Sequence, residues 1–449
     1  MPLTMLAQRI PAASHVLVLV ALATVSWDRL LNITMFGFNV KVPTVCFAAA
    51  LSLALLARLR ASTSDHRPAK ALPPALPRHL CLLILAALAM LMIGALISRR
   101  PVPGLLQIVT VILGAVVPLA ACVYAISSRS RLITALDAFI WGGVAAAAFG
   151  VYQYAAGISG WPQLIPYEDL GGGLPRISSF LYESGYFGYF MVLVISAVVA
   201  RHRLAPTGFF LRGSIPLVVA LVAVTLLANT RAAYLTLPLL GVLLVLSRPR
   251  RLPRTRTLVV AATAAVVVAG LILIVFPTLT HFLFERVASI LDPTEVSSNA
   301  PRLAVTSGVL RILADNFWLG IGPGNLFAYA PEYDLVIAGS SPNTVVANNA
   351  YLQALLDGGP MVLLLQVAIA VALLLVTFRW SRPVASALAT GWLAVASVAF
   401  VGTSYFWDLK LWAVAGLALA AAAVAPRAEV EARPDLDDTA PTASAERAA

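Results

Sequence analysis

Two arginines interrupt apolar parts of the sequence. Arg231 divides an otherwise nearly continuous apolar stretch from 213 to 247, and Arg176 follows the glycine-rich piece 171–173 and opens another apolar run. A guanidinium group offers N–H donors in a fixed planar fork, so it can hold two oxygens of an anion at once. At Arg231, snorkelling of the side chain to a membrane surface is the alternative interpretation. As ligands, both arginines suit a diphosphate.

Five further arginines fall on the same side of the topology predicted below. A charge there is not needed for topology and is costly wherever it enters lipid. Together with Arg176 and Arg231 they could form one positive, partly dehydrated basin. The five are Arg99, Arg100, Arg286, Arg302 and Arg311.

Glu183 is the best candidate for a general base. We expect it one helical turn into an apolar span, seven residues after Arg176. A carboxylate buried in apolar surroundings holds a proton more tightly, as a general base requires. The alternative is a structural salt bridge to Arg176 or Arg231. His281 is expected at a membrane interface, and the weaker acidic candidates are Glu332, Asp334 and Asp357, the last beside a helix break at 358–360.

The composition places these residues in a membrane protein. Of 449 residues, 60% are hydrophobic and only 11% are charged, and the mean hydropathy is +0.89. Soluble domains carry about 25% charged residues, so a soluble enzyme, a disordered chain and a nucleic-acid binder are excluded. The three cysteines lie in apolar runs, which indicates core packing and predicts neither a disulfide framework nor a metal site.

Twelve apolar runs are long enough to cross about 30 Å of hydrocarbon as helices. Of the 31 Lys and Arg residues, 21 fall on one side of this arrangement, so the positive-inside rule predicts that both termini are cytoplasmic. The predicted fold is an all-α polytopic membrane protein. The predicted spans lie near 14–27, 39–58, 79–98, 103–127, 132–157, 179–200, 213–229, 232–247, 257–276, 359–378, 386–405 and 409–425.

Four regions follow from this pattern. Residues 1–276 hold spans one to nine, and residues 277–349 form a large loop on the extracytoplasmic side. A loop of that length needs its own structure, so we expect a helical cap that includes an amphipathic stretch at 302–317 and a turn-rich piece at 320–325. Residues 350–425 hold the last three spans. The tail, 426–449, is expected to be disordered.

Four motifs occur in a fixed order. The first is Arg176-Ile-Ser-Ser-Phe-Leu-Tyr-Glu183-Ser-Gly, and the second is Asn229-Thr-Arg231-Ala-Ala-Tyr. The third is Arg302 followed by Asp315-Asn-Phe-Trp-Leu-Gly-Ile-Gly-Pro-Gly-Asn325, and the fourth is Asn348-Asn349-Ala-Tyr351-Leu-Gln-Ala-Leu-Leu-Asp357-Gly-Gly. This pattern resembles the O-antigen ligase and O-antigen polymerase superfamily from about residue 140 to 380, whereas the first five spans agree only in topology.

The resemblance implies a metal-independent membrane glycosyltransferase of the GT-C type with no cofactor. Such enzymes move a glycan from an undecaprenyl diphosphate donor to a sugar hydroxyl at the outer face of the bacterial inner membrane. Arg176 and Arg231 match the family arginines thought to hold the diphosphate, Arg302 is a third candidate, and Arg286, Arg311, His281, Asn349 and Tyr351 are further candidates. The expected partners are the donor, a glycan or lipid A-core acceptor, and membrane lipid, with no nucleic acid.

The fourth motif departs from the ligase pattern. Ligases of this family carry a His-Asn pair where this chain has Asn348 and Asn349. An amide cannot take a proton at physiological pH, so Asn348 could only orient a hydroxyl or donate a hydrogen bond. We therefore expect a polymerase of O-antigen or exopolysaccharide repeat units, with a ligase as the alternative. A transporter of lipid-linked oligosaccharide is the alternative from another class, but Asp137 is nearly the only midplane charge.

Overall fold

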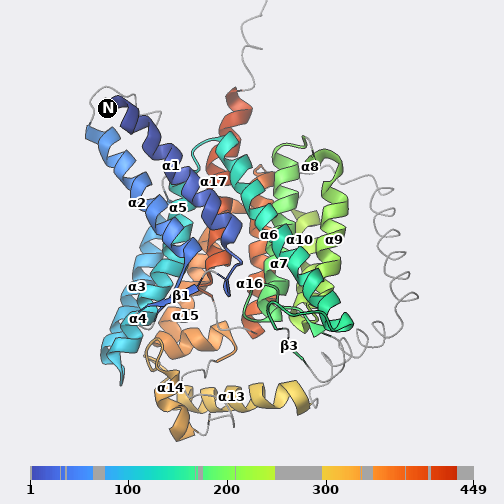
Figure 1. The fold of residues 1–449 in the computed structure, drawn as a ribbon. Coiled ribbons are helices and arrows are strands. Elements are labelled where there is room, and N and C mark those ends of the chain that lie inside the picture. Colours follow the sequence, from blue (N-terminus) through green and yellow to red (C-terminus); the bar gives the residue numbers. More distant parts are fainter. Residues whose placement is uncertain are drawn as a thin grey trace, which may run out of the picture.

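The chain forms a bundle of helices, seen here in a computed structural model (Figure 1). The structure describes residues 3–30, 32–35, 38–63, 76–166, 168–169, 175–207, 209–247, 296–333, 335, 347–379, 381–402 and 406–431.

Most apolar runs fold as helices because a helix satisfies its own backbone hydrogen bonds, which lipid cannot do. In chain order the elements are α1 Leu3–Thr24, β1 Asn32–Met35, β2 Phe38–Lys41, α2 Val42–Thr63, α3 Arg78–Ile97, α4 Pro101–Val111, the π-helix η2 Ile112–Val116, α5 Val117–Ala125, α6 Arg129–Ser159, β3 Glu168–Asp169, β4 Pro175–Arg176, α7 Ser184–Leu204, α8 Phe209–Arg212, α9 Ser214–Leu227, α10 Arg231–Leu246, α13 Val296–Asp315, α14 Leu326–Tyr329, the 3-10 helix η3 Ala330–Tyr333, α15 Ala350–Thr377, α16 Pro383–Gly402 and α17 Leu409–Glu431.

The prediction of an all-α membrane protein is confirmed in its general form. Within the described residues, six helical segments are long and apolar enough to cross a membrane, and the two small sheets have two strands each. The predicted first, seventh, eighth, eleventh and twelfth spans correspond to α1, α9, α10, α16 and α17, whose apolar parts run for 10–17 residues. The predicted ninth span, 257–276, lies outside the described residues. Twelve spans therefore remain a prediction.

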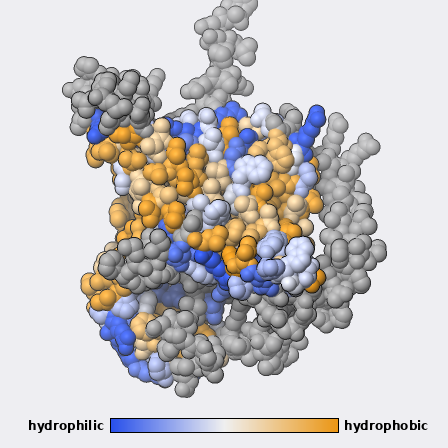
Figure 2. Space-filling model, in the orientation of Figure 1, coloured by the Kyte–Doolittle hydropathy of each residue, from blue (hydrophilic) through white to orange (hydrophobic). Residues whose placement is uncertain are grey.

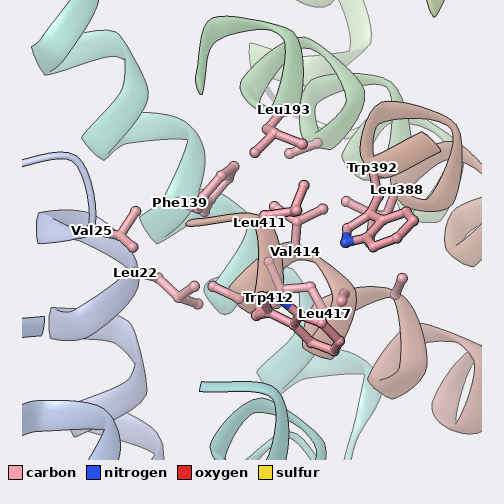
Figure 3. Close-up of a cluster of buried hydrophobic side chains, with 14 of the residues drawn as sticks. Leu22, Val25, Phe139, Leu193, Leu388, Trp392, Leu411, Trp412, Val414 and Leu417 are labelled. Carbon is pink, nitrogen blue, oxygen red and sulfur yellow. The ribbon is translucent and has the colours of Figure 1, made fainter. Parts of the chain in front are cut away.

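Helix α17 lies in the centre of the bundle. Leu411, Val414 and Leu417 pack between residues of α1, α6, α7 and α16, among them Phe139 and Trp392 (Figure 3). Alanines and glycines allow this close packing: a Cβ added at Gly416 would lie only 2.8 Å from the Cβ of Cys122 on α5. The helix continues to Glu431, beyond residue 425 where the predicted span ends, and the rest of the predicted tail lies outside the described residues.

The two ends of the bundle differ. The start of α1 and helix α8 lie at one end, whereas the α6–α7 loop with β3, together with α13 and α14, lies at the other (Figure 1). On the face shown in Figure 2, a band rich in hydrophobic residues crosses the bundle, and hydrophilic residues gather below it, toward the end that carries α13. We call the end that carries α13 the motif end, because the sequence motifs lie there.

Helices α13, α14 and η3 pack in a second, smaller hydrophobic cluster. Its buried members include Val309, Ile312, Leu326 and Tyr329, and it also includes Leu356 of α15. These helices lie in the predicted 277–349 region. Whether this region forms an extracytoplasmic cap remains a prediction.

Helix α15 is broken near its start. Gly358 and Gly359 have non-helical φ and ψ angles, and Gly359 combines a φ of 67° with a ψ of −165°. Such angles are essentially restricted to glycine. A Cβ at Gly359 would lie 2.1 Å from the carbonyl oxygen of Trp318, so the break also leaves room for the turn that follows α13.

Candidate functional site

The loop between α6 and α7 presents Arg176 and Glu183 at the motif end. Arg176 is half-buried and lies in β4, which pairs with β3 as an antiparallel strand. In the register of these two strands, Arg176 lies opposite Glu168. Gln153 of α6, itself 1% exposed, holds the backbone beyond Arg176. Its Oε1 atom accepts hydrogen bonds from the N–H groups of Ser178 (3.0 Å) and Ser179 (2.9 Å), while its Nε2 donates to the carbonyl of Ile165 (3.0 Å).

Ser179 has the left-handed φ of 54°. Its hydroxyl donates to the carbonyl of Ala146 at 2.7 Å, and its side chain is fully buried. Left-handed backbone is unfavourable for most residues with a side chain, so the three hydrogen bonds to Ser178 and Ser179 and the burial must hold it. The turn keeps the segment between Arg176 and Glu183 out of α7.

Arg29 holds the other end of the same loop. Its N–H donates to the carbonyl of Phe180 at 3.0 Å, and its guanidinium donates to the carbonyls of Tyr182 (2.6 Å) and Pro166 (3.2 Å). The ring of Phe180 stacks on Phe149 at 4.4 Å. Neither Arg29 nor Gln153 stood out as a site residue in the sequence. A polar Gln inside an apolar span was the available signal.

Glu183 lies in a different place from the one we expected. It is the residue immediately before α7, at the N-cap position, and its side chain is exposed. The expectation of a carboxylate buried one turn into a span is therefore wrong. The physical reason is the Ser179 turn, which delays the start of the helix to Ser184.

The second motif forms the start of α10. Asn229 has a left-handed φ of 51°, Thr230 follows in extended conformation, and Arg231 is the first helical residue. The Thr230 hydroxyl oxygen lies 3.1 Å from the position that a Cβ of Gly188 would occupy, so the start of α10 packs against the second turn of α7. This contact places the backbone of Arg231 close to the beginning of α7. The Arg231 side chain lies outside the described part of the structure.

The fourth motif forms the start of α15. Asn348 has a left-handed φ of 52°, and Asn349 caps the helix, with Oδ1 accepting hydrogen bonds from the N–H groups of Tyr351 (2.9 Å) and Leu352 (3.1 Å). The Tyr351 hydroxyl donates to the carbonyl of Ala396 on α16 at 3.2 Å. Asn349 and Tyr351 thus have structural partners, whereas Asn348 is half-buried ahead of the helix.

Helix α16 links the three motifs. It packs against α7, α10 and α15, each of which begins with motif residues. All three helices start at the motif end (Figure 1). The structure therefore brings together the backbone positions of Glu183, Arg231 and Asn348 around one helix.

Several arginines of the expected basin contact α14 and η3. Arg99 pairs with Glu332 and lies 4.0 Å from the ring centre of Tyr329, and Arg100 lies 5.2 Å from that of Phe327. The hydrogen bond that the Arg99 guanidinium donates to the carboxylate of Glu332 raises the pKa of Arg99. These contacts tie the end of α3 to the segment that follows α13.

The remaining candidates are not drawn into one cluster by the described contacts. Arg311 is exposed and donates to the carbonyl of Tyr333 at 2.9 Å. Asp357 is buried and accepts a hydrogen bond from Gln353 at 2.7 Å. His281, Arg286 and Asp334 lie outside the described residues, as does the side chain of Arg302.

A buried charge network adjoins Arg29. Asp28 is 4% exposed and pairs with Lys41 at 2.6 Å and with Lys410 at 3.1 Å, and Lys410 also pairs with Asp408 at 3.0 Å. Burial alone would raise the pKa of Asp28, but the two ammonium groups more than offset it and hold the pKa below its ordinary value. The network ties the segment after α1, the end of β2 and the start of α17 together beside the motif loop.

The fold and these three polar turns define a helical membrane protein with a candidate site at one end of its bundle. Residues 216–367 match the family model described as O-antigen ligase, a region that contains Arg231, Arg302 and Asn348. Over these residues the chain is similar to the O-antigen ligase family, which agrees with the resemblance that the four sequence motifs indicate. Among the curated proteins, none matches the chain.

Proposed function

We propose that this protein transfers a glycan from undecaprenyl diphosphate to a sugar hydroxyl at the outer face of the bacterial inner membrane, with both termini in the cytoplasm. The main support for the proposal is that three helices, each of which begins with motif residues, pack around α16. Residues 216–367 of the same chain match the O-antigen ligase family model. A diphosphate donor needs cationic ligands beside a group that handles the acceptor hydroxyl. Arg176, Arg231, Glu183 and Asn348 supply those chemical types.

In this reaction the bond between the donor sugar and the diphosphate breaks, and a bond to the acceptor oxygen forms. Negative charge develops on the leaving diphosphate, which Arg176 and Arg231 stabilise electrostatically, with Arg302 as a third candidate. The proton of the acceptor hydroxyl passes to Glu183. Asn348 orients that hydroxyl through its amide. Exposure of Glu183 leaves it accessible to an acceptor that arrives from solvent.

Among reactions of this type, we favour polymerisation of O-antigen or exopolysaccharide repeat units. The amide at Asn348, where family ligases carry histidine, supports a polymerase. Transfer of the glycan to lipid A-core is the alternative. For a transporter, midplane charges should line a path, but Asp137 accepts a hydrogen bond from Arg201 at 2.7 Å, and this ion pair is a structural role for the charge.

The test is to incubate the purified protein in phosphatidylethanolamine and phosphatidylglycerol vesicles with lipid-linked oligosaccharide, with and without lipid A-core. We expect longer glycan chains on the lipid carrier and release of undecaprenyl diphosphate. Transfer to lipid A-core would instead assign a ligase. An unchanged oligosaccharide under both conditions would contradict the proposed glycosyltransferase.

A further inference from the structure

Three consecutive large apolar residues follow α13 with their side chains exposed. The exposed fractions are 47% for Phe317, 78% for Trp318 and 52% for Leu319, and the two aromatic rings meet edge to face at 5.3 Å. We call these three residues the aromatic turn. A contiguous exposed apolar group of this kind marks an interaction surface more often than a single exposed side chain does.

The backbone of the aromatic turn is fixed against the break in α15. A Cβ at Gly359 would lie 2.1 Å from the carbonyl oxygen of Trp318 and 2.9 Å from that of Phe317. Just beyond, the N–H of Ile321 donates to the carbonyl of Leu356 at 2.7 Å. The turn is therefore anchored through its main chain, and its side chains are left for another contact.

An exposed apolar stripe on α15 begins beside the same break. Met361, only two residues after Gly359, is 50% exposed. The stripe continues at spacings of three and four residues, which is one face of a helix. Its further members are Leu364, Val367, Val371 and Leu375. In a helix that crosses a membrane, such a face contacts lipid. The aromatic turn thus lies at the end of a lipid-facing surface.

Two arginines at the end of α3 lie close to the loop that follows the aromatic turn. A Cβ at Gly322 would lie 2.7 Å from the Cβ of Ser98, so the loop that follows the aromatic turn packs on the end of α3, directly before Arg99 and Arg100. Both arginines are exposed. Arginines next to the end of an apolar span, with tryptophan at the same depth, are typical of the interface between hydrocarbon and headgroups.

We propose that the aromatic turn inserts into the interfacial layer of the bilayer and anchors α13, α14 and η3 to the membrane surface. Lipid is the partner because the turn continues the lipid-facing stripe of α15. The anchor fixes the height, relative to the bilayer surface, of the short 350–357 segment of α15 that precedes the break, and with it the height of Asn348. The insertion itself does not depend on the proposed reaction.

The test measures the depth of a nitroxide label in the full chain. Cys46, Cys81 and Cys122 are changed to Ala, and Trp318→Cys is labelled in phosphatidylethanolamine and phosphatidylglycerol vesicles. Collision of the label with oxygen, which concentrates in lipid, is compared with collision with a water-soluble nickel chelate. Leu364→Cys on the stripe is the lipid control, and Ala314→Cys, exposed on the last turn of α13, is the aqueous control.

We expect an oxygen-to-nickel collision ratio at position 318 several-fold above that at position 314 and approaching that at position 364. If the Trp318→Cys variant fails to fold, a label at Leu319→Cys keeps Trp318 in place. Its collision ratio must then also lie several-fold above that at position 314 and approach that at position 364. A ratio at both positions equal to that at 314 overturns the proposal. A nickel-accessible label that becomes protected only when lipid-linked oligosaccharide is added also overturns it, and assigns the aromatic pair to glycan stacking. Because no transfer activity is measured, failure here is distinct from failure of the proposed function.

Discussion

Ser179, Asn229 and Asn348 share one backbone feature. Among the residues the structure describes, they are the three non-glycine residues with positive φ, and each lies in a different motif, beside Arg176, Arg231 or the start of α15. Left-handed backbone costs about 1–3 kcal/mol at residues with a side chain and is found at functional sites more often than elsewhere. Asn tolerates it best, because its side chain can form local hydrogen bonds. We infer that these turns set the direction of the backbone at the motif residues next to them.

Asn348 offers a way to separate backbone shape from amide chemistry. Asn348→Gly keeps the left-handed turn without strain but removes the amide. We predict that it lowers the rate of transfer about tenfold, because a lost orienting hydrogen bond costs about 1–3 kcal/mol. Asn348→Ala should be slower still and less heat-stable. Rates from a polymerisation assay and melting temperatures check this, and a fully active glycine variant would show that only the turn matters.

Glu183 carries the proton in our proposal. Glu183→Gln keeps the shape and the hydrogen bonds but cannot accept a proton, so we predict unchanged donor affinity and a loss of turnover of about a hundredfold or more. Donor binding and polymer synthesis are measured on the same preparation. Near-normal synthesis in this variant, together with an inactive Asn348→Ala, would assign the chemistry to the fourth motif and a structural role to Glu183.

At the scale of elements, Gln153 connects α6 to the motif loop. Gln153→Leu leaves two buried N–H groups and one carbonyl without this partner, and each such loss costs about 1–3 kcal/mol. We predict a lower melting temperature and at least a tenfold loss of transfer. Gln153→Glu should retain most activity, because a protonated carboxyl can accept from Ser178 and Ser179 and donate to Ile165. Equal activity in the leucine variant would show that the loop is fixed elsewhere.

The sequence predicts the helices well and the local geometry of the motifs poorly. Runs of about 20 apolar residues define the spans because a helix must cover the hydrocarbon thickness. Likewise, the glycines at 320–325 and at the α15 break predict turns, and Gly320, Gly322, Gly324 and Gly359 have positive φ. By contrast, the apolar run beginning at 179 gave the wrong position for Glu183. Hydrogen bonds to Gln153, about 25 residues away, decide that the helix begins at Ser184.

Charge placement shows the same limit. Assigning charges to one side of the membrane groups Arg99, Arg100 and Arg311 with Arg176. In the structure, Arg99, Arg100 and Arg311 instead contact α14, η3 or the loop before them. The pairings of Arg99 with Glu332 and of Arg100 with Asn325 join residues more than 200 positions apart. A single sequence does not encode them in any local spacing.

At the scale of the whole molecule, the Asp28 network should make stability depend on pH. The folded pKa of Asp28 is below its ordinary value of 3.8. Its contribution is therefore fully present above about pH 4 and is lost as the pH falls further. Asp28→Asn leaves a buried ammonium short of a partner, which costs about 3 kcal/mol or more.

Melting temperatures in detergent check this prediction. The melting temperature of the wild type should exceed that of Asp28→Asn by a constant margin from about pH 7 to pH 5, and this difference should shrink below about pH 4. Glu332→Gln, which removes an exposed ion pair, should change little at any pH. A margin that grows on acidification would contradict the assignment.

The central claim is that distant parts of the chain act on one diphosphate, and a double-mutant cycle on donor affinity tests it most directly. The dissociation constant of undecaprenyl-diphosphate-linked oligosaccharide is measured for Arg176→Ala, Arg231→Ala and the double variant, with Arg212→Ala at the opposite end as the control. Each single change should weaken binding about tenfold to a hundredfold. The two losses should couple, so that the double variant binds better than their sum implies. Unchanged affinity in both single variants, or strictly additive losses, would contradict a shared diphosphate site.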